Sequence, residues 1–219
     1  MSAAKNGLFL HEEILLLVLR EREGTTAGFS QYPYALGGAF LAELMEHGRI
    51  RLDRQGRGTR VEVIDGRPVG EPVLDECLER LSRARSQARI ETWVARFAGL
   101  KGLKHRVAEG LCQRDILRAD ERQVLLFFRR RIYPEVDPRP EREILERLRR
   151  AVFGIESGGR RTWLLVSLAH QAGLLRIVFD RRTLRQCRDR IRQRIGEEPV
   201  GRAVHATVQA AAAAAVACG

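Results

Sequence analysis

The feature that most constrains the fold is the apolar stretch LFLHEEILLLVLRERE at residues 8–23. Its apolar residues recur at helical spacing and, in the second half, cover most of the helix circumference. Glu12 and Glu13 stand in the first turns, where carboxylates oppose the positive end of a helix, and Gly24 follows as a stop signal. We therefore expect a buried central helix at residues 8–23 on which the rest of the chain packs.

A second helix is expected over residues 34–47, ending at Gly48. The connector before it contains Phe29, Tyr32 and Pro33. Because proline disfavours the helical conformation of the residue before it, Pro33 is expected to end any helix that runs through the connector. The aromatic side chains are expected either to cover the core or to face a ligand.

The rest of the pattern is also mainly helical. Apolar residues at helical spacing predict further helices at residues 73–83, 91–97, 100–117 (a helix leading into a strand), 140–153, 162–172, 183–195 and 202–217. Alternating residues predict short strands at 49–52 and 60–64, joined as a hairpin. The expected fold is mainly α: a single globular helical domain over residues 1–219, with residues 1–6 flexible and short β-hairpins.

Composition limits the function classes. The net charge of +11 indicates that a charged partner is an anion, such as nucleic acid, an acidic membrane surface or a phosphorylated headgroup. The alternative is that many of the arginines are solvated surface residues. The four cysteines and five histidines are scattered, so we expect no metal, no cofactor and reduced thiols in a cytoplasm. No paired carboxylates or nucleophile constellation indicates an enzyme, and the longest apolar run is too short to span a bilayer.

Basic residues concentrate in residues 101–131, where nine basic residues stand against four acidic ones. Lys101, Lys104 and His105 are predicted to share one outward face of a helix, since residues three and four apart are neighbours there. Such a set of cations would hold a phosphate group. The alternative is an ordinary solvated face.

The most unusual segment is VLLFFRRR at residues 124–131. Five consecutive apolar residues, including Leu125, Leu126 and Phe127, are followed by three arginines, a layout suited to an anionic membrane interface. Two alternatives remain. A helix followed by a basic hairpin also resembles a winged-helix module for nucleic acid, although VLLFF is too apolar for a wing that tracks phosphates. The apolar segment would also suit an interface between copies of the chain in a homo-oligomer.

Three blocks in the same order resemble the Golgi phosphoprotein 3 family: LFLHEEILLLVLREREG at residues 8–24, HGRIRLD at 47–53 and ILRADERQVLLFF at 116–128. The resemblance covers almost the whole chain and implies a mostly helical fold with a central buried helix. It also implies a peripheral membrane protein, on the cytoplasmic face, that binds phosphatidylinositol 4-phosphate in a basic pocket and inserts a hydrophobic hairpin. Eukaryotic members recruit protein clients by their cytoplasmic tails, and the composition here suggests a bacterial member.

The resemblance also assigns positions to the headgroup site. Two pocket arginines of the family fall on Lys101 and Lys104, the pocket tryptophan falls near Phe29, and the inserting tip falls on residues 125–127. A third pocket arginine falls on Gly37. That position departs from the family pattern, because a glycine cannot bind a phosphate through a side chain.

Overall fold

The computed structural model describes residues 7–19, 31–55, 58–124, 128–196 and 199–217, and it is mainly helical, as predicted. The helices are α1 (Leu10–Val18), α2 (Tyr32–Glu46), α3 (Pro72–Ser82), α4 (Ile90–Ala98), α5 (Leu103–Cys112), α6 (Arg139–Phe153), α7 (Arg160–Gln171), α8 (Leu175–Val178), α9 (Arg181–Gln186), α10 (Arg188–Ile195) and α11 (Pro199–Ala217). The strands are β1 (Ile50–Gln55), β2 (Gly58–Val63), β3 (Asp120–Val124) and β4 (Phe128–Ile132). Residues 1–6, expected to be flexible, lie outside the described residues.

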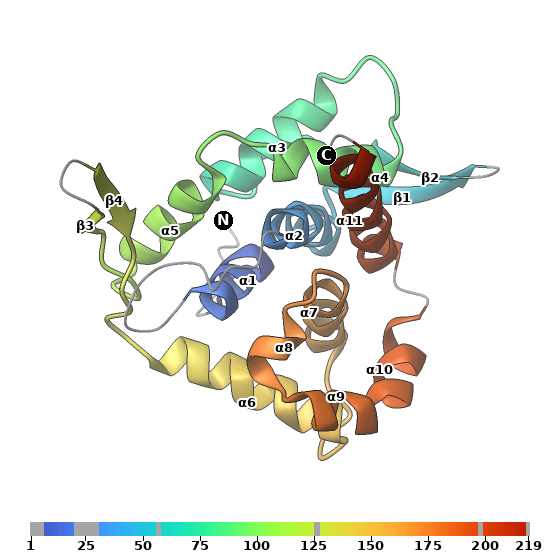
Figure 1. Cartoon of the computed structure of the whole chain (residues 1–219). Coiled ribbons are helices and arrows are strands. Elements are labelled where there is room, and N and C mark those ends of the chain that lie inside the picture. Colours follow the sequence, from blue (N-terminus) through green and yellow to red (C-terminus); the bar gives the residue numbers. More distant parts are fainter. Residues whose placement is uncertain (1–6, 20–30, 56–57, 125–127, 197–198, 218–219) are drawn as a thin grey trace.

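Helix α1 is the central element, as its apolar circumference predicts, and every one of its residues is buried. Figure 1 shows α1, α2 and α7 in the middle of the molecule, with the other elements arranged around them. The predicted end of this helix was wrong. Leu19 is extended, with φ −71° and ψ 143°, so the helix ends at Val18 rather than at Glu23. Leu19 is still buried, which shows why apolar periodicity did not reveal where the helix stops.

The two glutamates of α1 do more than oppose the helix dipole. Glu12 and Glu13 are 4% and 3% exposed, and each meets an arginine from a distant part of the chain. Glu12 forms an ion pair with Arg114, and Glu13 accepts a hydrogen bond of 2.7 Å from Arg147 Nη2. Because buried charges need partners, these contacts account for part of the arginine excess.

Helix α2 begins at Tyr32, so Pro33 lies inside its first turn and does not exclude a helix there. The physical reason is that the N–H groups of a first turn have no partner within the helix, and proline lacks only that group. Tyr32 and Tyr34 therefore belong to the helix rather than to the connector. Residues 20–30 of that connector lie outside the described part of the chain.

The carboxyl-terminal third differs in detail from the prediction. The helix expected at residues 183–195 is divided into α9 and α10, which meet at Cys187. The four-residue helix α8 is too short to show a periodic pattern. Helix α11 begins at Pro199, three residues earlier than expected, because proline is favoured in a first helical turn.

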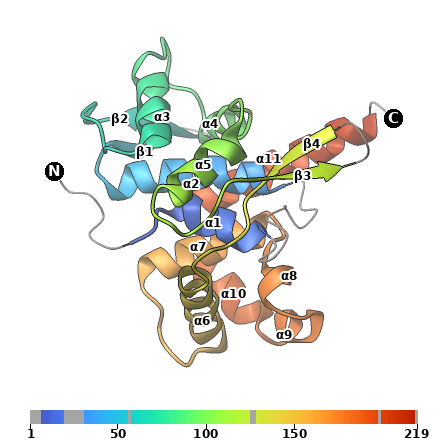
Figure 2. The ribbon, with the colours of Figure 1, turned by 90° about the vertical axis from the view of Figure 1, so that its left-hand side faces the viewer.

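Both hairpins are two-stranded and antiparallel, and each stands as a separate sheet. In β1–β2, Ile50 pairs with Val63, and in β3–β4, Asp120 pairs with Ile132. Figure 2, which views the molecule from its left side in Figure 1, shows β3–β4 in front and close to α5, with α11 behind the hairpin.

Candidate functional site

Helix α5 carries the predicted basic face, and its sequence explains how that face is oriented. Leu103, Val107 and Leu111 are buried on the inner side, as their spacing predicts. The residue before the helix, Gly102, has φ +65°, a backbone conformation that glycine adopts without a steric penalty. The chain can therefore turn sharply into α5 and leave Lys104 and His105 at the partly exposed surface.

Lys101 does not share that helical face, which corrects the prediction. It is exposed in the turn before α5 and is separated from the helix by the left-handed Gly102. The prediction failed because it extended helical spacing across a glycine that starts the helix. Lys104 and His105 remain neighbours on α5.

Lys104 and His105 both contact Tyr133, which follows β4 and is 1% exposed. The Nζ atom of Lys104 lies 5.8 Å from the centroid of the Tyr133 ring, within the range of a cation–π interaction. His105 Nδ1 lies 2.9 Å from the Tyr133 hydroxyl oxygen. The base of the hairpin is thereby joined to the outer face of α5.

Arg130 on β4 brings a third element to this place. Its charge acts on Lys104 of α5 and on Tyr32 at the start of α2. Burial makes the largest contribution to lowering the pKa of Lys104, and the charge of Arg130 makes a smaller one. We call the surface formed by Tyr32, Lys104, His105, Arg130 and Tyr133 the α5–hairpin surface.

The hairpin itself carries an unfavourable pair of like charges. Arg122 of β3 is directly opposite Arg130 of β4, so the two side chains share one face of the hairpin. Like charges in directly opposite positions destabilise a sheet by up to about 1 kcal/mol. The fold thus maintains a local positive charge on this face.

Several other basic residues of this region are already neutralised. Arg106 forms an ion pair with Glu76, Arg114 with Glu12, and Arg118 with Asp120 at 3.4 Å. Arg131 lies 3.3 Å from Glu109. The count of nine basic residues therefore overstates the charge that is open to a partner.

Four of the predicted site residues lie outside the part of the chain that the structure describes. They are Phe29 and the hairpin tip Leu125, Leu126 and Phe127. The strands on either side of the tip are described, and their ladder ends with Val124 opposite Phe128. The tip expected at residues 125–127 therefore stays a prediction.

Gly37 lies in the core and takes no part in the α5–hairpin surface. It is buried in α2, where a Cβ atom at this position would stand 2.5 Å from the backbone oxygen of Val94 on α4. Real Cβ atoms do not approach an oxygen so closely, so a larger side chain would force α2 and α4 apart. The third pocket arginine of the resemblance has no place here.

Sequence reasoning missed Tyr133, and it named Tyr32 and Arg130 without placing them near Lys104. A usable signal existed for Arg130, because a hairpin centred on residues 125–127 pairs it with Arg122. Tyr133 gave none, since its role depends on how α5 and the hairpin meet in space.

Comparison with known proteins shows which family the chain resembles. The sequence model of the family described as Golgi phosphoprotein 3 (GPP34) matches residues 10–211, which is most of the chain. The chain belongs to the Golgi phosphoprotein 3 family. This family assignment confirms the resemblance seen in the three sequence blocks.

Two relatives of this family member share one name. Vacuolar protein sorting-associated protein 74 of Eremothecium gossypii is 31% identical over 139 residues, which are 55% of this chain and 42% of that protein. The protein of the same name from Schizosaccharomyces pombe is 28% identical over 139 residues, again 55% of this chain and 41% of that protein. The alignments thus span less than half the length of these relatives.

None of the described helices is long and apolar enough to cross a membrane. Within the same residues, no group of three or more His, Cys, Asp or Glu side chains has the arrangement of a metal site.

Proposed function

We propose that this member of the Golgi phosphoprotein 3 family is a peripheral membrane protein that binds anionic phospholipid headgroups at the α5–hairpin surface. The observation that carries the proposal is the position of Lys104 and Arg130. The charge of Arg130, in the middle of β4, acts on Lys104 of α5, and in the sequence Leu125, Leu126 and Phe127 join β4 to β3. A headgroup bound there would bring the apolar tip to the acyl boundary of the same membrane.

The electrostatics of Lys104 support an anionic ligand. Its pKa is lowered by burial and by the neighbouring Arg130. Both influences disfavour the charged form of the lysine. A phosphate group at this place would supply the missing counter-charge and favour the protonated amine.

The expected energies favour reversible binding that needs both parts of the surface. Fully burying three large apolar side chains contributes roughly 5 to 8 kcal/mol before ordering is subtracted, and less for shallow insertion. Each basic residue close to an acidic leaflet adds about 1 kcal/mol. Neither contribution alone is much larger than the free-energy cost of the translational, rotational and side-chain freedom lost on binding.

Phosphatidylinositol 4-phosphate is the finer form of this proposal. The family resemblance suggests it, and Lys104 and Arg130 are chemically suited to a phosphomonoester. Because position 37 is a glycine, one phosphate ligand of the family pattern is absent. We therefore expect only a modest preference for phosphatidylinositol 4-phosphate over other anionic lipids.

Vesicle flotation tests the proposal with the whole chain. The vesicles contain phosphatidylcholine alone, phosphatidylcholine with phosphatidylserine, or phosphatidylcholine with phosphatidylinositol 4-phosphate. Replacing Lys104 and Arg130 by Gln should weaken binding to acidic vesicles by about 2 kcal/mol, or roughly 30-fold. Replacing Arg188 and Arg202 by Gln gives the same loss of net charge on exposed positions of α10 and α11 and should change little.

Changing Leu125, Leu126 and Phe127 together to Ser should also release the protein from acidic vesicles. Equal recovery on neutral and acidic vesicles, or none on either, would refute binding to anionic headgroups. Equal loss in the Lys104/Arg130 and Arg188/Arg202 variants would show that only net charge matters. Titration with duplex DNA separates the alternative, because a nucleic-acid module would bind DNA with a steep dependence on salt.

The relatives are named for vacuolar protein sorting, and this suggests a role for the bound protein. On the cytoplasmic face of a membrane, it would recruit client proteins through their cytoplasmic tails. Pairing of two copies through the hairpin is the alternative to insertion of the hairpin into a membrane. Light scattering after size-exclusion chromatography, with and without the Ser changes at residues 125–127, measures that pairing directly.

A further inference from the structure

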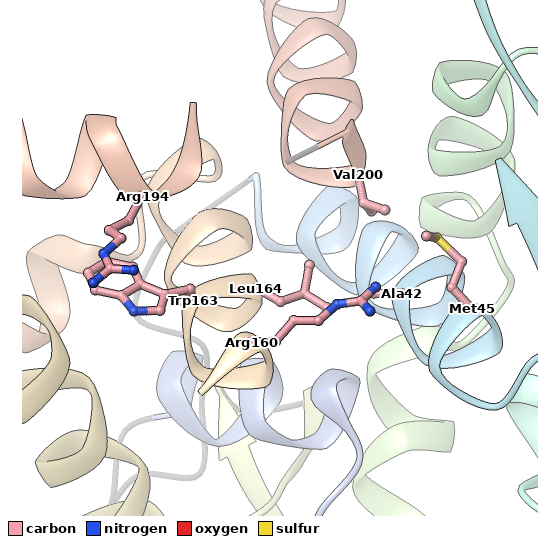
Figure 3. Close-up of a pocket in the computed structure, with 7 residues that line it drawn as sticks. All are labelled: Ala42, Met45, Arg160, Trp163, Leu164, Arg194 and Val200. Atoms are coloured by element: carbon pink, nitrogen blue, oxygen red, sulfur yellow. The ribbon is translucent and has the colours of Figure 1, made fainter. Parts of the chain in front are cut away.

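A second concave site lies far from the hairpin, between α2, α7, α10 and the start of α11. Its volume is about 230 Å³, and its apolar lining includes Ala42 and Met45 of α2, Leu164 of α7 and Val200 of α11. Figure 3 shows these side chains around one hollow. An apolar cavity of about 150 Å³ is large enough for benzene, so this one accepts a longer apolar group.

The wall on the α10 side is a tryptophan covered by an arginine. Trp163 is 8% exposed, and its Nε1 atom donates a hydrogen bond of 2.8 Å to the Ser157 carbonyl oxygen. The guanidinium carbon of Arg194 lies 5.6 Å from the centroid of the Trp163 ring. The ring is therefore held in one orientation, with an exposed cation above it.

A second arginine stands at the opposite side of the hollow. Arg160 begins α7, and its side chain is 77% exposed, with its Nε atom 3.5 Å from Glu46. Figure 3 shows the Arg160 side chain extending across the hollow towards Ala42, while Arg194 lies over Trp163. Two guanidinium groups thus flank an apolar floor.

From this geometry we infer that the hollow, which we call the Trp163 pocket, binds a single acidic amphiphile, namely a fatty acid with its chain on the apolar floor. The carboxylate would lie against Arg194 at one side of the hollow, since a guanidinium group pairs with a carboxylate through two parallel hydrogen bonds, whereas Arg160 at the other side is already paired with Glu46. The proposed membrane site does not explain this pocket. Figure 1 places α10 and α11 on the opposite edge of the molecule from β3–β4.

The probe is sodium decanoate, titrated as monomer into the full chain and followed by calorimetry. The sequence contains two tryptophans, Trp93 and Trp163. A Trp93→Phe variant keeps only Trp163, so its fluorescence reports on the pocket alone. Decanoate should bind at one saturable site and change the Trp163 emission. Decanol, which lacks the carboxylate, should bind about tenfold more weakly, and decyltrimethylammonium should not compete.

Replacing Arg160 and Arg194 by Gln should weaken decanoate about tenfold and leave decanol unchanged. The matched control replaces Arg149 and Arg188, exposed arginines of α6 and α10 that do not line the pocket, and should retain wild-type affinity. Met45→Trp fills the half-buried rim and should abolish binding, with circular dichroism checking the fold. The Lys104/Arg130 variant should bind decanoate normally, so a failure of the lipid-headgroup proposal would leave this result intact.

Three results would overturn the inference. They are the absence of saturable binding to the wild-type chain, equal affinity for decanol and decanoate, and equal weakening in the pocket and control variants. Binding of a peptide with an apolar carboxyl-terminal residue, without binding of decanoate, would also overturn it, because the pocket would then serve protein chains.

Discussion

Arg161 Nη2 lies 2.6 Å from Glu43 Oε1, although the two residues are 118 positions apart in the sequence. The same nitrogen atom donates to the backbone oxygen of Leu8, also at 2.6 Å. The guanidinium therefore ties the start of α7 to α2 and to the residues that precede α1. These are the helices on which the whole fold is built.

Removing Arg161 should destabilise the protein, because the buried Glu43 would lose its arginine partner and keep the Leu10 N–H and His47 as neighbours. Breaking a buried ion pair costs about 3 to 5 kcal/mol, and we expect the lower end for Arg161→Met because the arginine is about a third exposed. The free energy of unfolding in urea measures the loss. Arg160→Met alters the exposed neighbour and should change stability by less than about 0.5 kcal/mol. Equal urea midpoints for the two variants would contradict this role of Arg161.

Two glycines inside helices should respond in opposite directions to alanine. A Cβ atom at Gly37 would meet the Val94 oxygen at 2.5 Å, so Gly37→Ala should lower stability by about 1 to 3 kcal/mol. At Gly110 of α5 the nearest atom would be Glu12 Oε1 at 3.6 Å, an ordinary contact. Gly110→Ala should therefore raise stability by about 0.5 to 1 kcal/mol through helix propensity. Thermal unfolding of the two variants in parallel checks both signs.

The pKa of His105 reports the arrangement of the α5–hairpin surface. Burial first, and then the charges of Lys104 and Arg131, lower this pKa below its ordinary value. Lys104→Gln removes one of these charges and should raise the pKa of His105. Nuclear magnetic resonance titration of the imidazole measures it, with Arg188→Gln as a control that should leave it unchanged. No change in the Lys104 variant would place the two side chains further apart than described here.

His11 should make the protein sensitive to mild acid. Burial, with smaller contributions from Arg114 and Arg161, lowers its pKa to about 3 from an ordinary value of 6.5. Below pH 6.5 the unfolded chain binds a proton on this residue while the folded chain does not. The free energy of unfolding therefore decreases as the pH is lowered. The loss between pH 6.5 and pH 5 should be about 2 kcal/mol from this group.

His11→Phe should remove this loss, since the ring stacks on Phe9 and packs against Phe40, contacts that a phenyl ring can also make. The nearby carboxyls act in the opposite direction. Burial raises the pKa values of Glu12, Glu13 and Glu71, and the folded state then binds protons more readily. Both proteins share these groups, so the difference between their urea midpoints at pH 5 and pH 7.5 isolates His11. An identical pH dependence in both would disprove the assignment.

The helical fold could be predicted because it follows from periodicity. The apolar run at residues 14–19, which covers most of the helix circumference, required a central position for the first helix. Helix ends were less predictable, since Pro33 is compatible with a first helical turn and Leu19 is buried in an extended conformation. Local sequence does not contain the tertiary contacts that decide such ends.

The candidate site could be predicted only in part. Charge density indicated α5 and the hairpin, but it did not show which cations were neutralised. Arg114 is paired with a glutamate about a hundred residues earlier, whereas Lys104 is placed beside another cation. Such assignments depend on contacts between distant segments, and the role of Tyr133 depends on them as well.

The close contact of Gly37 with α4 also limits how this lineage can evolve. No single codon change at position 37 can introduce a guanidinium without rebuilding the crossing of two core helices. Any shift in ligand preference must therefore arise elsewhere, at side chains that the packing leaves free to vary. Lys104, half-buried at the surface of α5, is such a position, because a substitution there leaves the contact between α2 and α4 unchanged.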